Sequence, residues 1–198
     1  MIKIKYIGIE MDIKYDTAQH IFDVNHPPVE SIGLSLDSLF AAVPHIEEHY
    51  FWLDFKNLKA TYRDQTCNML VNICNKYHVK YHHVIVESSN PRQLKPFTEK
   101  GFYTSYYIPT FDIAKCSKES IEKYYLLVKD QLSKSTVNAI SSHSQSLPFM
   151  RKYFPDANYL VWHIYDWKGI AYYSSLYGIR KDKRVKVILT QEKSRGYR

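Results

Sequence analysis

The feature that most constrains the fold of this chain is a regular alternation of short apolar segments with segments of helical periodicity. Short runs rich in β-branched and aromatic residues occur at residues 6–13, 50–55 and 83–88, and they predict buried strands. Further strands are expected at residues 102–108, 137–141, 158–164 and 185–189, with a shorter one at residues 21–24. Continuous apolar strands that alternate with helices through short connections are typical of parallel sheets covered by helices.

The predicted helices have recognisable beginnings and ends. Apolar residues recur with 3.6-residue spacing between about residues 61 and 77, which indicates an amphipathic helix. Ser35 and Ser117 are expected to cap two further helices, because a serine hydroxyl can accept a hydrogen bond from the first turn. A short helix from Pro91 should end at Gly101. A last helix is expected at residues 146–153.

Two α/β architectures fit this order: an open doubly wound sheet and a (β/α) barrel of the TIM type. A TIM barrel usually needs eight strands and about 250 residues. This chain has 198 residues, which suits a single domain over residues 1–198, and about seven principal strands by the same pattern. A barrel built from it would therefore be incomplete by one strand.

The composition indicates the kind of partner only broadly. The chain has 27 basic and 20 acidic residues, so its formal charge is +7, which suits an anionic partner. Much of the excess lies between Arg180 and Arg198, and a charged tail of this kind more often forms a solvated face than a binding site. The hydrophobic content of 45% excludes a disordered or low-complexity chain.

The three cysteines indicate a reducing compartment. Cys67, Cys74 and Cys116 form neither a CxxC motif nor a disulfide framework, and the first two are expected to face the core from one helix. No run approaches the ~20 apolar residues that a membrane-spanning helix needs. The N-terminus lacks the apolar core of a signal peptide, so a cytoplasmic location is expected.

Acidic residues interrupt three of the apolar strands. Glu10 and Asp12 are two residues apart and so point to the same side of their strand, as do Asp54 and Lys56 on theirs, and Glu87 follows three β-branched residues. Each group is expected near the carboxyl end of its strand, where parallel α/β proteins place their active sites. Four acids brought to one end of a sheet would repel one another strongly.

A divalent cation would relieve this repulsion. Mg²⁺ and Ca²⁺ both prefer sites made of oxygen ligands, so the acids predict a site for one of these ions. Lys56 beside Asp54 then suits an anionic substrate such as a phosphate. Each acid taken singly could instead cap a helix or pair with a nearby lysine, and Glu87 is the weakest member of the set.

His26 differs from the other eight histidines because it lies in a stiff segment, Asn25-His26-Pro27-Pro28, shortly after the strand that carries Glu10. A histidine near a metal-bound phosphodiester could act as the general acid for the leaving alcohol. No HExxH motif occurs, which argues against a zinc site of that type. The sequence also lacks a GxSxG motif, a P-loop and a GxGxxG motif.

These motifs together resemble the glycerophosphodiester phosphodiesterases, which are TIM barrels of the phospholipase C-like phosphodiesterase superfamily. The resemblance rests on Glu10-x-Asp12, on His26 about fourteen residues later, and on Asp54-x-Lys56 in the next strand. It covers roughly residues 6 to 60; beyond them only the strand–helix rhythm agrees, which is weak evidence for function.

The resemblance implies a role for each of these residues. Glu10, Asp12 and Asp54 would be ligands of Mg²⁺ or Ca²⁺, and Lys56 would contact the substrate phosphate. His26 would protonate the leaving group. Glu87 would line the substrate pocket. The implied activity is metal-dependent hydrolysis of a small phosphodiester, in lipid metabolism, rather than action on a nucleic acid.

The sequence also departs from the family pattern. Pro27 stands where the family usually has Asp, and Asp54 stands where Glu is usual. The family's first strand ends in His-Arg-Gly or a variant with the second catalytic histidine, and this chain begins just before the family's second strand. We therefore expect an incomplete barrel, either a fragment or a degenerate form, that catalyses poorly by itself.

Two other functions remain open. A non-catalytic barrel could bind a phosphorylated ligand or a protein partner, which would suit a chain that lacks one catalytic histidine. A nuclease of the PD-(D/E)xK type also needs an acid-x-Lys pair, an upstream acid and Mg²⁺, and the positive charge would suit DNA. The sole Pro-Asp pair, Pro155-Asp156, comes too late for that motif, and the sheet topology should discriminate the two folds.

Overall fold

A computed structural model describes residues 8–165 and 168–191 of the chain. The chain divides into two compact units. The first comprises Met1–Tyr107 and Gln131–Asn138, and the second comprises Ile108–Asp130 and Ala139–Arg198. The single domain over residues 1–198 stays a prediction.

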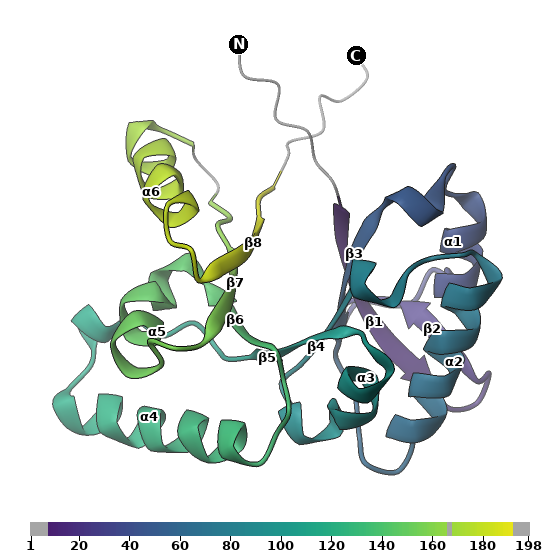
Figure 1. The fold of residues 1–198 in the computed structure, drawn as a ribbon, viewed down its shortest axis with the longest axis horizontal. Coiled ribbons are helices and arrows are strands. Elements are labelled where there is room, and N and C mark those ends of the chain that lie inside the picture. Colours follow the sequence, from purple (N-terminus) through teal and green to yellow (C-terminus); the bar gives the residue numbers. More distant parts are fainter. Residues whose placement is uncertain (1–7, 166–167, 192–198) are drawn as a thin grey trace. The chain divides into compact units, whose positions relative to one another are not determined.

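The first unit is built on a mostly parallel sheet (Figure 1). Strands β1 (Gly8–Asp16), β3 (Tyr50–Phe55), β4 (Val84–Ser88) and β5 (Tyr103–Tyr107) are parallel neighbours in that order. Strand β2 (Ile21–Val24) forms an antiparallel hairpin with β1 and lies at the edge. The short buried runs of the sequence thus become the central strands, as predicted.

Three helices accompany these strands in the chain: α1 (Leu36–Ala42), α2 (Arg63–Lys76) and α3 (Lys95–Lys100). The hydroxyl of Ser35 accepts a hydrogen bond from the backbone of Ser38, which confirms the predicted cap of α1. Helix α3 ends at Gly101, whose φ of 94° is left-handed and favours glycine. Three short 3₁₀ helices join the elements: η1 (Ile46–Glu48), η2 (Tyr81–His83) and η3 (Pro91–Gln93).

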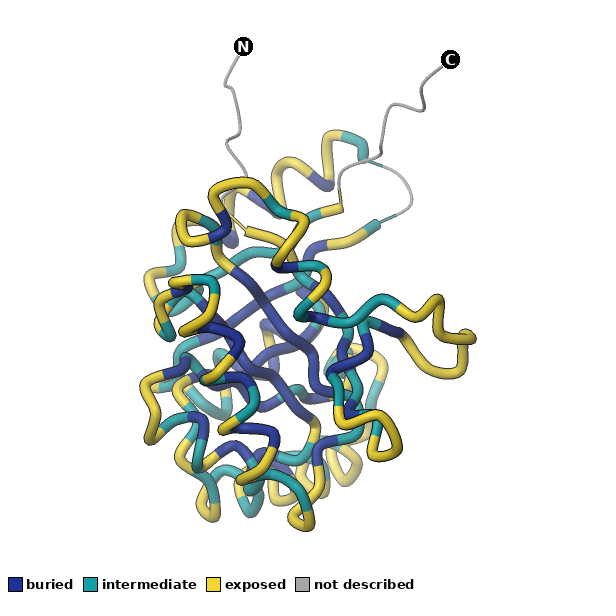
Figure 2. Tube along the Cα trace, turned by 90° about the vertical axis from the view of Figure 1, so that its right-hand side faces the viewer, coloured by how far each residue is buried: buried dark blue, intermediate teal, exposed yellow. Residues whose placement is uncertain are grey.

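The two faces of this sheet differ because side chains alternate along each strand. In β3, Phe51, Leu53 and Phe55 belong to the hydrophobic core that the strands share with the helices. Trp52 and Asp54 therefore point to the other face. Figure 2 shows burial concentrated along the strands and exposure along the outer turns of the helices. The face opposite the helices carries the acidic residues.

The second unit contains three parallel strands, β6 (Ala139–His143), β7 (Asn158–Trp162) and β8 (Val185–Leu189). Its helices are most of α4 (Lys118–Ser133), whose last three residues belong to the first unit, together with α5 (Leu147–Tyr153) and α6 (Ile170–Arg180). It also contains the 3₁₀ helices η4 (Ile113–Lys115) and η5 (Ser144–Ser146). The predicted cap Ser117 accepts a hydrogen bond from the backbone of Ser120. Helix α6 was not predicted from the sequence.

The fold class is therefore α/β with mostly parallel strands, which is consistent with an incomplete TIM-type barrel. Closure into a barrel and the count of seven principal strands stay predictions. In the part of the chain that the structure describes, no helix has both the length and the apolar character needed to traverse a bilayer.

Candidate functional site

The register of the parallel strands places four polar residues in one row across the first unit. Asp12 of β1 pairs with Asp54 of β3, Asp54 with Glu87 of β4, and Glu87 with Ser105 of β5. Residues in register on adjacent strands point to the same face of a sheet. The acids that are widely separated in the sequence thus become neighbours.

Two members of this acidic row (Asp12, Asp54, Glu87) are buried, and Asp12 is partly buried. Asp54 is 8% exposed and Glu87 is 1% exposed. Both are the next-to-last residues of their strands, as predicted. Strand β1 continues to Asp16 as part of the hairpin, so Glu10 and Asp12 lie within it rather than at its end.

Lys56 joins two members of the row. Its Nζ lies 2.6 Å from Oδ1 of Asp12 and 2.5 Å from Oδ2 of Asp54. Its backbone N–H donates to the carbonyl of Ile13, which holds the residue beside β1 just past the end of β3. Burial would lower the pKa of Lys56, but the hydrogen bonds and charges of both aspartates outweigh burial and raise it. The side chain is therefore a fixed ammonium.

Glu10 experiences an unfavourable environment for its negative charge. Its pKa is raised from 4.5 to about 7, chiefly by burial and further by the charges of Asp12 and Asp54, while Lys56 opposes the shift. Burial also raises the pKa of Asp54, although its hydrogen bond to Lys56 works against the shift. The carboxylates are thus close enough to repel one another, and the lysine compensates them only in part.

The β1–β2 hairpin brings His26 back to this end of the sheet. Because β2 runs antiparallel to β1, Val24 pairs with Ile13 and the backbone N–H of Asn25 donates to the carbonyl of Asp12 at 3.0 Å. His26 follows directly and is exposed. Its positive charge lowers the pKa of Asp54, which places the imidazole within electrostatic reach of the row.

Asn25 extends the row and was not predicted as a site residue. It lies opposite Asp12, on the same face as Asp23, whose carboxylate pairs with Lys14 at 3.3 Å. Asn25 is only 7% exposed, and neither its Oδ1 nor its Nδ2 has a hydrogen-bond partner among the described residues. The sequence does contain a signal for Asn25. Phe22 and Val24 point to the core, so the alternation of side chains along the strand places Asn25 on the same face as Asp23.

Tyr107 is a second site residue that the sequence analysis missed. Burial raises the pKa of its phenol, and the carboxylates of Asp54 and Glu87 raise it further while Lys56 lowers it. The side chain therefore lies near the acidic row, on the face that Ser105 shares two residues earlier. Many of the eighteen tyrosines have equally unremarkable sequence surroundings, so no motif distinguishes this one.

A second group of potential metal ligands lies outside the acidic row. Within residues 8–165 and 168–191, one group of three or more His, Cys, Asp or Glu residues has all its ligand atoms within 4.8 Å: His45, Glu47 and Glu48. These side chains are exposed and come from η1 and the residue before it, ahead of the amino end of β3. The acidic row lies towards the opposite ends of the strands.

The donor chemistry of the three predicted metal ligands nevertheless fits a divalent cation. Glu10, Asp12 and Asp54 offer only carboxylate oxygens, the ligands that Mg²⁺ and Ca²⁺ prefer. The raised pKa of Glu10 shows that an additional positive charge there would be favourable. Lys56 occupies the position between the two aspartates, so an ion would share them with its ammonium.

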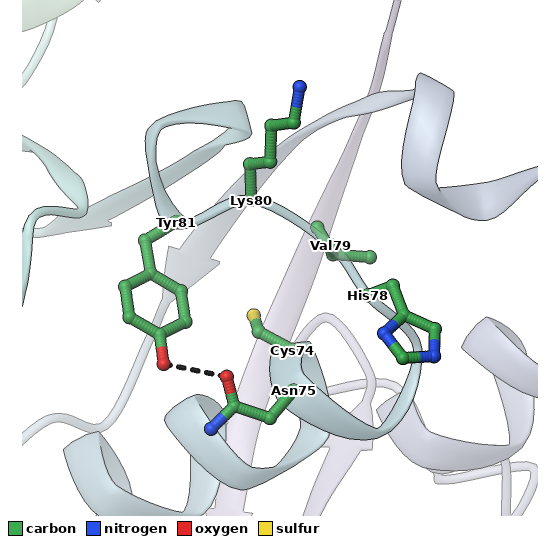
Figure 3. A pocket seen from close by; sticks show the side chains of 6 residues that line it. All are labelled: Cys74, Asn75, His78, Val79, Lys80 and Tyr81. Carbon is green, nitrogen blue, oxygen red and sulfur yellow. Dashed lines mark hydrogen bonds between the residues drawn. The ribbon is translucent and has the colours of Figure 1, made fainter.

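A surface pocket of about 400 Å³ lies elsewhere in the first unit (Figure 3). It is lined by the end of α2 and the segment before β4, including Cys74, His78 and Lys80. The hydroxyl of Tyr81 donates to Oδ1 of Asn75 across it at 2.7 Å. Because this segment precedes β4, the pocket is at the amino end of the strands, away from Asp54 and Glu87.

Sequence comparison identifies no relative of this chain: no protein-family model matches it, and no curated protein matches it. Solved structures do match. A glycerophosphodiester phosphodiesterase from Parabacteroides distasonis aligns over 93% of this chain and 79% of its own, at 14% identity and a TM-score of 0.60. A phosphodiesterase from Oleispira antarctica, solved with its product sn-glycerol-3-phosphate, aligns over 95% and 81%, at 12% identity and a TM-score of 0.54.

The chain thus has the fold of the glycerophosphodiester phosphodiesterases. This confirms, at the level of the fold, the resemblance inferred from roughly residues 6 to 60. The roles of Glu10, Asp12, His26, Asp54, Lys56 and Glu87 stay predictions, but the structure brings these residues to one face and one end of the first unit.

Proposed function

We propose that this chain is a metal-dependent phosphodiester hydrolase that acts on small glycerophosphodiesters. The observation that carries the proposal is the acidic row with Lys56 held between Asp12 and Asp54, on a fold shared with glycerophosphodiester phosphodiesterases. The neighbour from Oleispira antarctica holds a glycerol phosphate product, which supports a substrate of this size for the present chain.

We assign a divalent cation, Mg²⁺ or Ca²⁺, to Glu10, Asp12 and Asp54. One ammonium cannot neutralise two aspartates and a nearby glutamate, and burial, followed by the charges of Asp12 and Asp54, raises the pKa of Glu10. The Oδ1 of Asn25, buried beside Asp12, is a further oxygen that such an ion could use. When bound, the cation would polarise the phosphoryl oxygens of the substrate.

The other residues handle the phosphate and the proton. Lys56, a permanently charged ammonium, donates hydrogen bonds to a phosphoryl oxygen and offsets the charge that develops there. His26, exposed at the end of the hairpin, holds a proton for the leaving alcohol. Glu87 and Tyr107 line the pocket beside the acidic row and orient the hydroxyl groups of the substrate.

The second candidate is a module that binds a phosphorylated ligand without turnover. It is favoured by one observation: the family's His-Arg-Gly motif is absent from these 198 residues, and no His-Arg pair occurs. The nuclease alternative has no support, because strands β1, β3, β4 and β5 form one parallel ladder and the solved neighbours are phosphodiesterases.

The first test is thermal melting of the chain with and without Mg²⁺ or Ca²⁺. A ligand at 100 times its dissociation constant stabilises a protein by roughly 2.7 kcal/mol. We expect Asp54→Asn to abolish this gain. The matched control is His45→Gln with Glu48→Gln, which removes the exposed ligand group and should leave the gain intact. If the double variant loses the gain and Asp54→Asn keeps it, the metal binds at η1 and the assignment is wrong.

The second test measures turnover of glycerophosphocholine and binding of sn-glycerol-3-phosphate, each with the metal present. Hydrolysis that falls about a hundredfold in His26→Gln, with metal stabilisation unchanged, supports the enzyme. Metal-dependent binding of glycerol phosphate without any turnover by the unaltered chain supports the binding module. If neither ligand binds, both candidates are wrong.

A further inference from the structure

Helix α6 carries apolar side chains on two opposite faces. One face packs inside the second unit and buries Tyr172, Leu176 and Ile179. The other face is open: Ile170 is 89% exposed, Tyr173 is 57% exposed and Tyr177 is 63% exposed. Figure 1 shows the helix beside β8. Packing within the unit accounts for the apolar side chains of the buried face. It does not account for those of the exposed face.

The exposed residues form a single stripe. Ile170, Tyr173 and Tyr177 are spaced by three and four residues, so their side chains follow one another along the same side of the helix. Single exposed apolar residues are common on proteins, but a contiguous stripe of large ones marks an interaction surface. Ser174 and Gly178, two exposed small residues, lie on the same side of the helix.

Positive charge adjoins this stripe. Nζ of Lys181 lies 4.2 Å from the centre of the Tyr177 ring, and Arg180 and Lys183 are exposed beside it. Residues 168–191 contain six basic side chains and one acid: Lys168, Arg180, Lys181, Lys183, Arg184, Lys186 and the acid Asp182.

The single acid does not offset this charge at the surface. Asp182 accepts hydrogen bonds from Arg151 at 2.8 Å and from Arg184 at 3.0 Å, and the arginines lower its pKa. Its charge is therefore balanced within the unit. The cations of Arg180, Lys181 and Lys183 remain available to an anionic partner.

We propose that this α6 stripe (Ile170, Tyr173, Tyr177 and Lys181) docks on an anionic lipid surface. Interfacial helices combine an apolar face that enters the boundary between headgroups and acyl chains with basic residues that reach the lipid phosphates. Tyrosine suits that boundary because its ring is apolar and its hydroxyl stays wet. A second copy of the chain fits less well, because each copy would bring the same basic cluster to the contact.

The test is co-sedimentation with vesicles of phosphatidylcholine, with and without phosphatidylserine. We expect the chain to bind the anionic vesicles and not the neutral ones, and added salt to weaken binding. Ile170→Ser with Tyr177→Ser should lower the vesicle partition at least about tenfold. The matched control is Leu126→Ser with Leu127→Ser on α4, which removes two equally apolar exposed residues and should leave binding unchanged.

The charge contribution has its own pair of variants. Lys181→Gln with Lys183→Gln should lower the partition by about five-fold per lysine. Lys118→Gln with Lys123→Gln, two exposed lysines on α4, should have little effect. All substituted positions are exposed, so circular dichroism melting should match the unaltered chain.

Three results would overturn the proposal. The chain could fail to bind anionic vesicles, or the α4 variants could lose as much binding as the α6 variants. Alternatively, sedimentation equilibrium could show a dimer that Ile170→Ser with Tyr177→Ser dissociates, which would assign the stripe to a second copy. The readout is binding rather than turnover, so the result is independent of the proposed activity.

Discussion

Replacement of Glu10 by glutamine should stabilise the metal-free protein at alkaline pH. The pKa of Glu10 rises from 4.5 to about 7 in the folded chain, first through burial and then through the charges of Asp12 and Asp54. Each tenfold change in a proton equilibrium is worth about 1.4 kcal/mol. The ionised side chain therefore costs the folded state up to about 3 kcal/mol, reduced by whatever water screens this partly exposed group.

The sign of the pH dependence follows from which state holds the proton. Below about pH 4.5 Glu10 is protonated in both the folded and the unfolded chain, so it does not affect stability. Between pH 4.5 and about 7 the unfolded chain loses this proton first, so the free energy of unfolding falls as pH rises. Above about pH 7 the loss is complete. Glutamine cannot ionise and should abolish this slope.

Urea denaturation of the two proteins, both freed of metal by a chelator, measures the effect. We expect Glu10→Gln to be more stable than the unaltered chain by up to about 3 kcal/mol near pH 8, and equally stable near pH 4.5. In a melt this corresponds to a rise of about 6 to 12 °C. Glu30→Gln, at an exposed position of the hairpin region, is the control and should show neither effect. Equal stability of Glu10→Gln and the unaltered chain near pH 8 would refute the electrostatic account of the row.

Three further predictions concern other parts of the structure. Asn25→Leu should raise metal-free stability by about 1 kcal/mol, because it replaces a buried amide that makes no hydrogen bond among the described residues, and should weaken metal binding about tenfold. Scanning calorimetry of the metal-free chain measures the first effect, and titration calorimetry with Mg²⁺ measures the second. Burial raises the pKa of the Cys67 thiol to about 11 and that of Cys74 to about 12, so iodoacetamide should label Cys116 alone in the folded chain, as peptide mass spectrometry would show. Leu70→Ala should lower the free energy of unfolding by 2–5 kcal/mol in urea titrations, since the side chain is fully buried in the core of the first unit.

The acidic site could be predicted because strand geometry is simple. Side chains alternate, so Glu10 and Asp12 must share a face, and Asp54 and Lys56 must share one as well. Parallel strands with short connections then place corresponding strand positions side by side. In the structure, Asp12 pairs with Asp54, and Asp54 pairs with Glu87, as this geometry predicts.

The sequence could not reveal how the lysine is used. The pattern Asp54-x-Lys56 suggests a cation for the substrate, but in the folded chain the ammonium bridges Asp12 and Asp54. That arrangement depends on distances between strands rather than on spacing along one strand. Tyr107 was missed for a related reason, since it is marked only by what surrounds it after folding.

Helix α6 shows how a segment can escape prediction and still be informative. A helix is recognised in a sequence by apolar residues on one side and polar residues on the other. In α6 each of the buried residues Tyr172 and Leu176 is followed by an exposed tyrosine, Tyr173 or Tyr177. Apolar residues therefore lie on both sides of the helix, and the 3.6-residue spacing of the buried side is not visible in the sequence. Local rules tend to fail where a surface serves something other than folding. The apolar residues that hid this helix in the sequence are therefore the same ones that indicate a partner outside the chain.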